Sequence, residues 1–176
     1  GTWSGHNSLY INQFSERFTL NHKEKIMGVI LQVARNYVVS SSSHLIVKVW
    51  EDLGLPGEVL YAKDVHLADL APYAANFIEF DSIVSVTDSF FVGYELFYNS
   101  PMDTFATYMA ANRLEDPFNT AYVYDGQWQS LSQYTNGLMH TSYAIMPVVF
   151  DSIPNGKPPV EAGTDLVLYP NPANAY

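Results

Sequence analysis

The chain has 176 residues, of which 48% are hydrophobic and 15% are charged, and this composition predicts one folded domain plus a short appendage. Acidic residues number 18 against 8 Lys and Arg, and the formal net charge of −10 argues against nucleic acid and anionic membranes as partners. The absence of Cys excludes disulfides and thiolate chemistry, and no apolar run is long enough to span a bilayer.

Short alternating runs predict β-strands along most of the chain. Apolar side chains occupy every second position in residues 27–33, and residues 44–50 repeat this pattern. Further strands are predicted at 17–20, 58–63, 77–80, 83–86, 89–98, 105–110, 121–124 and 143–150. Residues 66–75 are expected to form a loop with at most one helical turn, because Pro72 interrupts the helical pattern.

Turn residues separate these strands. Pro56-Gly57 predicts a type II turn with Gly57 at positive φ, and Asp125-Gly126 predicts a hairpin between Tyr124 and Trp128. Gly93, inside an aromatic strand, predicts a bulge or a close backbone approach. Many short strands with such punctuation predict an all-β fold, a jelly-roll-like β-sandwich of antiparallel strands, spanning residues 1–152.

The C-terminal segment has a different character. Residues 153–165 contain three Pro and two Gly and predict a linker, after which Leu166 begins a short apolar strand. The strand ends at Tyr169-Pro170-Asn171-Pro172, and this motif resembles the opening of the C-terminal sorting domain of the Bacteroidetes type IX secretion system. The resemblance implies that residues 166–176 are the truncated start of such a domain, which would engage the secretion machinery.

The same resemblance implies a location: the protein is secreted or attached to the outer-membrane surface. We expect the chain to be a piece of a longer exported protein whose upstream part carries any catalytic domain. An edge strand that lacks the rest of its own domain is expected to be disordered, or to pair with an edge of the sandwich or of a neighbouring molecule.

A second resemblance concerns the sandwich itself. Gly5-His6-Asn7, residues 47–50, residues 54–60 and residues 90–94 occur in an order similar to a β-sandwich module that precedes sorting tails in secreted Bacteroidetes proteins. This resemblance implies a non-catalytic accessory or adhesion module. The residues have structural roles as well, in turns and in the backbone of the strands.

The sequence offers little catalytic chemistry. Gly-x-Ser-x-Gly is absent, residues 40–43 form a serine-rich loop beside His44, and the five His residues lack the spacing of a zinc site. No cofactor is predicted. Acidic pairs such as Glu51-Asp52 and Glu115-Asp116, and the segment from Asp81 to Asp88, offer oxygen ligands for a structural Ca²⁺, with a solvated surface as the alternative interpretation.

Aromatic residues suggest carbohydrate binding, since sugar rings stack on exposed aromatic rings while amides and carboxylates bind the hydroxyls. The candidate residues, which fall in predicted loops or hairpin edges, are Trp3, Tyr73, Trp128, Tyr134 and Asn136. The alternative is that these rings cap the sandwich core. We therefore predict a module that binds a glycan or a protein surface, with a carboxylate-based hydrolase and a purely structural spacer as competing hypotheses.

Overall fold

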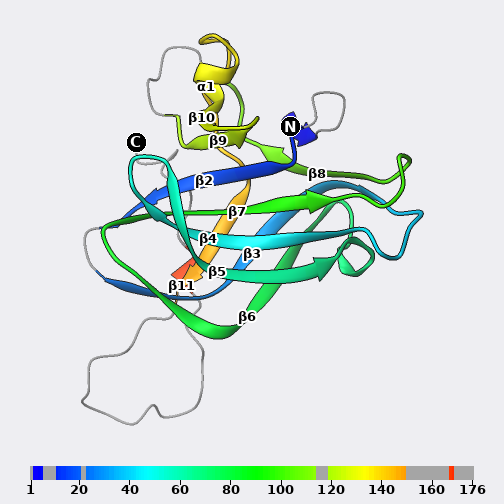
Figure 1. The fold of residues 1–176 in the computed structure, drawn as a ribbon, viewed down its shortest axis with the longest axis horizontal. Helices are drawn as coiled ribbons and strands as arrows, with labels where there is room; N and C mark the ends of the chain where they lie inside the picture. Colours follow the sequence, from blue (N-terminus) through cyan, green and yellow to red (C-terminus); the bar gives the residue numbers. More distant parts are fainter. Residues whose placement is uncertain (1, 6–10, 21–22, 114–118, 150–166, 169–176) are drawn as a thin grey trace.

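The computed structural model describes residues 2–5, 11–20, 23–113, 119–149 and 167–168, which form two packed antiparallel sheets (Figure 1). Sheet A contains β1 (Thr2–Gly5), β3 (Glu24–Tyr37), β6 (Ala74–Val86), β8 (Thr104–Met109), β11 (Ile145–Val149) and β12 (Val167–Leu168). Sheet B contains β2 (Gln13–Thr19), β4 (His44–Asp52), β5 (Pro56–His66), β7 (Ser89–Phe97), β9 (Ala121–Tyr124) and β10 (Trp128–Ser130).

This arrangement confirms the predicted all-β sandwich. Sheet B has the strand order β10-β9-β2-β7-β4-β5, and in sheet A the long strand β3 pairs with β6, β8 and β11. Successive strands cross repeatedly from one sheet to the other, as in a jelly roll. The crossing places β5 and β6 at edges that meet, where the rings of Tyr61 and Phe80 stack with centroids 4.3 Å apart.

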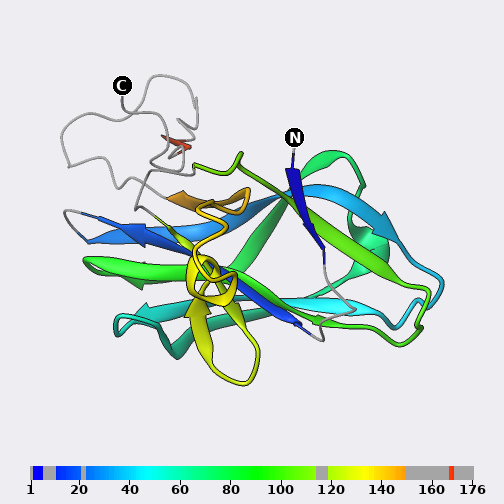
Figure 2. The ribbon, with the colours of Figure 1, turned by 90° about the horizontal axis from the view of Figure 1, so that it is seen from above.

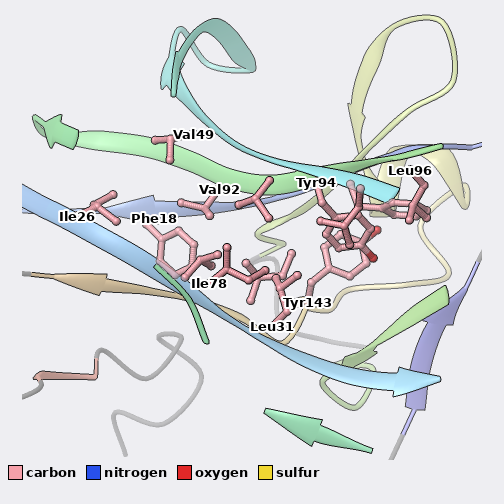
Figure 3. Close-up of a cluster of buried hydrophobic side chains, with 14 of the residues drawn as sticks. Phe18, Ile26, Leu31, Val49, Ile78, Val92, Tyr94, Leu96 and Tyr143 are labelled. Carbon is pink, nitrogen blue, oxygen red and sulfur yellow. The ribbon is translucent and has the colours of Figure 1, made fainter. Parts of the chain in front are cut away.

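The main core lies between the sheets and follows the alternation of the strands. Phe18, Val49 and Val92 point inward from sheet B, and Ile26 and Leu31 point inward from sheet A (Figure 3). Burial of each such side chain contributes about 1.5–3 kcal/mol relative to an exposed position. The alternation therefore fixes which residues of sheet B point away from this core.

Of two predictions that concern glycines, one is confirmed and one is wrong. A Cβ at Gly93 would lie 1.9 Å from the Phe14 carbonyl oxygen, so the predicted close backbone approach is confirmed. The predicted turn at Pro56-Gly57 is wrong, because Pro56 already begins β5. Gly54 takes the positive φ of 90° instead, and its N–H donates to Asp52 Oδ1 at 2.7 Å.

Several element boundaries also differ. The two strands predicted at 77–80 and 83–86 are one strand, β6, which bulges against β3. The loop at 66–75 contains one short 3₁₀ turn, η1 (Leu67–Asp69), as expected. A single-turn helix, α1 (Leu131–Tyr134), was not predicted, although Ser130 and Gln133 form the capping box that signals it.

The tail contributes one described strand. Val167 and Leu168 of β12 pair with Val149 and Val148 at the edge of β11, so these two residues extend the sandwich. The predicted linker 153–165 and the motif Tyr169-Pro170-Asn171-Pro172 lie outside the described residues. The sorting function of the tail therefore stays a prediction.

Candidate functional site

A second, smaller hydrophobic cluster lies on the outer face of sheet B. Trp50 on β4, Phe91 on β7 and Tyr122 on β9 are 3%, 0% and 9% exposed, although each points away from the main core. Phe91 and Tyr122 meet edge to face with ring centroids 5.0 Å apart. Trp128 packs against the group and is itself half-buried. We call Trp50, Phe91, Tyr122 and Trp128 the outer cluster.

The β9–β10 hairpin carries Trp128 to this cluster. Its Asp125-Gly126 turn, predicted from the sequence, has Gly126 at a φ of 106°. The Trp128 ring contacts Trp50 at 5.5 Å between centroids, although β9, β2 and β7 lie between their strands in the sheet order. The hairpin therefore folds over the outer face, and in Figure 2 its loop extends past β4 and β5 on that side.

Trp128 is held from two directions. Besides the edge-to-face contact with Trp50, its ring meets that of Tyr124 at 5.5 Å and an interplanar angle of 64°. Gln129 beside it donates to Asp125 Oδ2 at 2.8 Å, which braces the hairpin. These contacts fix a partly exposed indole ring next to the exposed side chains of Asp125 and Gln127.

An ion pair borders the outer cluster. Arg17 Nε donates to Asp52 Oδ2 at 2.6 Å, and the guanidinium lies 5.9 Å from the centre of the Phe91 ring. Burial lowers the pKa of Arg17, but the hydrogen bond and charge of Asp52 outweigh burial and hold this pKa above its usual value. Burial raises the pKa of Asp52, but hydrogen bonds from Ser89, Arg17 and Gly54 outweigh burial and hold this pKa below its usual value.

A second ion pair lies on the same face. Lys48 Nζ donates to Glu95 Oε2 at 2.5 Å, and both side chains are 16% exposed. Between the two ion pairs lies Ser15, whose Oγ is buried without a hydrogen-bond partner. In register, Ser15 stands opposite Gly93 on one side and Tyr122 on the other. The outer face of sheet B thus combines aromatic rings with cations that are already paired.

The residues predicted for glycan binding do not gather in one place. Trp128 belongs to the outer cluster, whereas Tyr134 packs against the main core and Asn136, at a φ of 53°, is exposed after α1. Tyr73 is 76% exposed in the connection from η1 to β6, at an edge of sheet A. Trp3 lies on β1, which pairs with β8 in the other sheet from Trp128.

Sequence reasoning missed the residues that support Trp128. Trp50 was read only as a strand residue, and Tyr122 and Arg17 were not singled out. One signal was available: Phe90 and Phe91 are adjacent in a strand, so one of them must point away from the sandwich core. An outward-facing Phe that is fully buried requires something to cover it.

The serine-rich loop has a structural arrangement. Ser43 Oγ donates to Asp103 and accepts from the Asn99 N–H at 2.8 Å. Both bonds link the serine-rich loop to the connection between β7 and β8. The His44 ring stacks on Phe97 at 4.9 Å between centroids. Within the described residues, neither partner of Ser43 is a histidine, so the arrangement differs from an activated serine nucleophile.

Asp103 explains this loop geometry. Its buried carboxylate accepts from Val39 N at 2.5 Å, from Ser40 N at 3.2 Å and from Ser43 Oγ. Burial raises the pKa of Asp103, but these hydrogen bonds outweigh burial and hold the pKa below its usual value. The carboxylate thereby ties the β3–β4 connection to the β7–β8 connection.

Two of the acidic residues considered for calcium have other partners. Asp52 binds Arg17, and Asp81 binds Lys63 Nζ at 2.6 Å. In the part of the chain that the structure describes, no group of three His, Asp or Glu side chains could hold a metal ion. Glu115-Asp116 lies outside that part, so structural calcium stays a prediction.

Exposed aliphatic side chains adjoin the outer cluster. Leu53, Leu55, Val59 and Leu60, at the β4–β5 connection and the start of β5, are between 43% and 69% exposed. Val59 pairs in register with Trp50, so this aliphatic patch continues the outer cluster to the edge of sheet B.

Comparison with known proteins gives no further guide to the site: no family model, curated protein or solved structure matches this chain. Among the described residues, no helix is long and apolar enough to cross a membrane. The candidate site therefore depends on the geometry of sheet B alone.

Proposed function

We propose that this protein is a non-catalytic recognition module that binds carbohydrate at the outer face of sheet B. The observation that carries the proposal is Trp128, a partly exposed indole held by ring contacts to Trp50 and Tyr124. A rigid aromatic ring loses little conformational freedom when a sugar ring stacks on it. Asp125 and Gln127, both exposed on the same hairpin, supply acceptors and donors for sugar hydroxyls.

The geometry sets the expected strength of binding. One stacking ring with a few hydrogen bonds on an open face supports dissociation constants of about 0.1–1 mM, equivalent to about 4–5.5 kcal/mol. Calorimetry against an oligosaccharide panel at millimolar ligand is therefore the test. Trp128→Ala is expected to weaken binding at least tenfold, whereas Tyr37→Ala, which removes a half-exposed ring from the other sheet, is expected to have no effect.

Two controls keep this test interpretable. Trp128→Phe retains an aromatic ring for stacking, so it is expected to bind the oligosaccharide more tightly than Trp128→Ala does. Equal losses in Trp128→Ala and Tyr37→Ala would contradict the proposal. A blank panel with the wild-type protein favours the structural spacer, and release of new reducing ends from the bound oligosaccharide favours the hydrolase.

A second candidate, recognition of a protein surface, is favoured by the aliphatic patch at Leu53, Leu55, Val59 and Leu60. Contiguous exposed aliphatic groups commonly mark protein contact sites. Peptides selected from a random library on the wild-type protein are expected to lose binding to a Leu53→Ser, Val59→Ser double variant. Peptides that bind both proteins equally would contradict this candidate.

We also propose that the module is secreted or surface-attached, and that the secretion machinery recognises its tail. The support is the resemblance of Tyr169-Pro170-Asn171-Pro172 to the type IX sorting motif. If the protein is surface-attached, external protease is expected to digest it on intact producing cells. If it is secreted, it is expected in the culture medium. Full protection in intact cells would contradict the proposed location.

A further inference from the structure

Resting on the proposed carbohydrate site, we infer that the outer face of sheet B selects uncharged glycans and rejects those with carboxylate or sulfate groups. The inference depends on how the charges of that face are partnered. It goes beyond the stacking argument, because an aromatic ring alone accepts neutral and acidic sugars alike.

The two cations beside the outer cluster are both neutralised at short range. Arg17 is 2.6 Å from Asp52, and Lys48 is 2.5 Å from Glu95. The carboxylates of these pairs are shielded, with Asp52 2% and Glu95 16% exposed. An anionic sugar would have to displace the partly buried Glu95 in order to bind Lys48. Arg17 is 38% exposed, and an anion that approached it would meet a guanidinium whose charge Asp52 already offsets at 2.6 Å.

The remaining charge near Trp128 is negative. Asp125 is exposed on the hairpin and accepts a hydrogen bond from the neutral amide of Gln129. Farther along the outer face, Asp64 on β5 pairs in register with Ile46 and lies 3.5 Å from His44 Nε2, which adds a second acidic group to this face. With a net charge of −10 on the whole chain, the local and overall fields both repel an anionic ligand.

A neutral glycan meets none of these obstacles. Its hydroxyls donate to the exposed carboxylate of Asp125, and the Arg17 and Lys48 ion pairs remain intact. Binding of a neutral ligand is therefore expected to depend little on ionic strength, whereas repulsion of an acidic ligand is screened by salt.

The test is calorimetry on the full chain with two classes of probe. The neutral probes are hexasaccharides of glucose, xylose and mannose, and the acidic probe is hexagalacturonic acid, each in 20 mM and 300 mM NaCl. We expect at least one neutral probe to bind at least tenfold more tightly than the acidic probe at 20 mM NaCl. The difference is expected to shrink at 300 mM NaCl.

A charge-neutralising variant provides the second readout. Glu95→Gln releases Lys48 from its ion pair and is expected to strengthen binding of hexagalacturonic acid at least threefold at 20 mM NaCl. Glu79→Gln makes the same change in net charge on an exposed residue of sheet A, and is expected to leave that binding unchanged. Equal effects of the two variants would show that the overall charge, not the outer face, excludes the acidic probe, and would overturn the inference.

The other outcomes are distinguishable. Binding of hexagalacturonic acid as tight as that of the neutral probes overturns the inference and leaves the carbohydrate site standing. Binding of neither class overturns the proposed function, and the inference with it.

Discussion

The contact between β2 and β7 at Gly93 gives the sharpest prediction for the fold. A Cβ added at Gly93 would lie 1.9 Å from the Phe14 carbonyl oxygen and 2.7 Å from Ser15 Cα. Both atoms belong to backbone, so no side-chain rotation relieves the clash. Gly93→Ala therefore requires the two central strands of sheet B to move apart.

The required movement sets the magnitude. Ordinary van der Waals contact begins at 3.4 Å, so β2 and β7 must separate locally by about 1.5 Å. Hydrogen bonds between strands tolerate only a few tenths of an ångström, and each lost bond costs about 0.5–1.5 kcal/mol. With the loss of packing between Phe14 and Tyr94, whose rings lie 5.3 Å apart, we expect a destabilisation of about 3–5 kcal/mol.

The assay is thermal unfolding followed by circular dichroism. For a chain of this length the expected loss corresponds to a fall in Tm of about 6–20 °C. Ser15→Ala is the matched control, because it acts at the paired position and removes only a buried hydroxyl that has no partner. Its Tm is expected to equal or exceed that of the wild type. A Gly93→Ala variant that melts within 2 °C of the wild type would refute the reasoning.

Further predictions concern the loops, the outer cluster and α1. Because Asp103 has a lowered pKa in the folded state, its charge stabilises the fold above the usual aspartate pKa of about 3.9, and this stabilisation is lost as the pH falls through the lower folded pKa. Urea unfolding of Asp103→Asn should therefore show a smaller loss of stability in acid than urea unfolding of the wild type. The same loss of stability in both proteins would contradict this expectation. Trp50→Ala should cost about 3–5 kcal/mol and Trp128→Ala about 1–2 kcal/mol by the same method, and the reverse order would contradict the assignment of Trp50 as the buried member. Ser130→Ala should cost about 1 kcal/mol through loss of the capping box, and faster hydrogen exchange restricted to α1 would locate the effect.

The strand pattern of this protein could be read from its sequence because half-buried strands impose a period of two on apolar residues. The run at 27–33 lies inside β3, and the Asp125-Gly126 signal marks the β9–β10 hairpin. The turn at Gly54 was missed because Pro56-Gly57 is the stronger local signal. The short helix α1 was missed because one helical turn has no period to detect.

The candidate site was less accessible. The sequence singled out Trp128 as an aromatic residue on a hairpin edge, but gave equal standing to Tyr73 and Tyr134, which the fold places at an edge of sheet A and against the main core. Exposure is a property of the packed sheets. It cannot be inferred from a residue's position in a predicted loop.

By itself, then, the sequence determined that this chain forms an acidic, cysteine-free sandwich of short antiparallel strands, since alternation, turn residues and charge are local properties. Only the tertiary structure decided that Trp50, Phe91, Tyr122 and Trp128 form one cluster and that Arg17 and Lys48 are neutralised by Asp52 and Glu95. These contacts join strands that are far apart in the chain. They depend on strand order and on a hairpin folding over the sheet, and neither is encoded in any short run of residues.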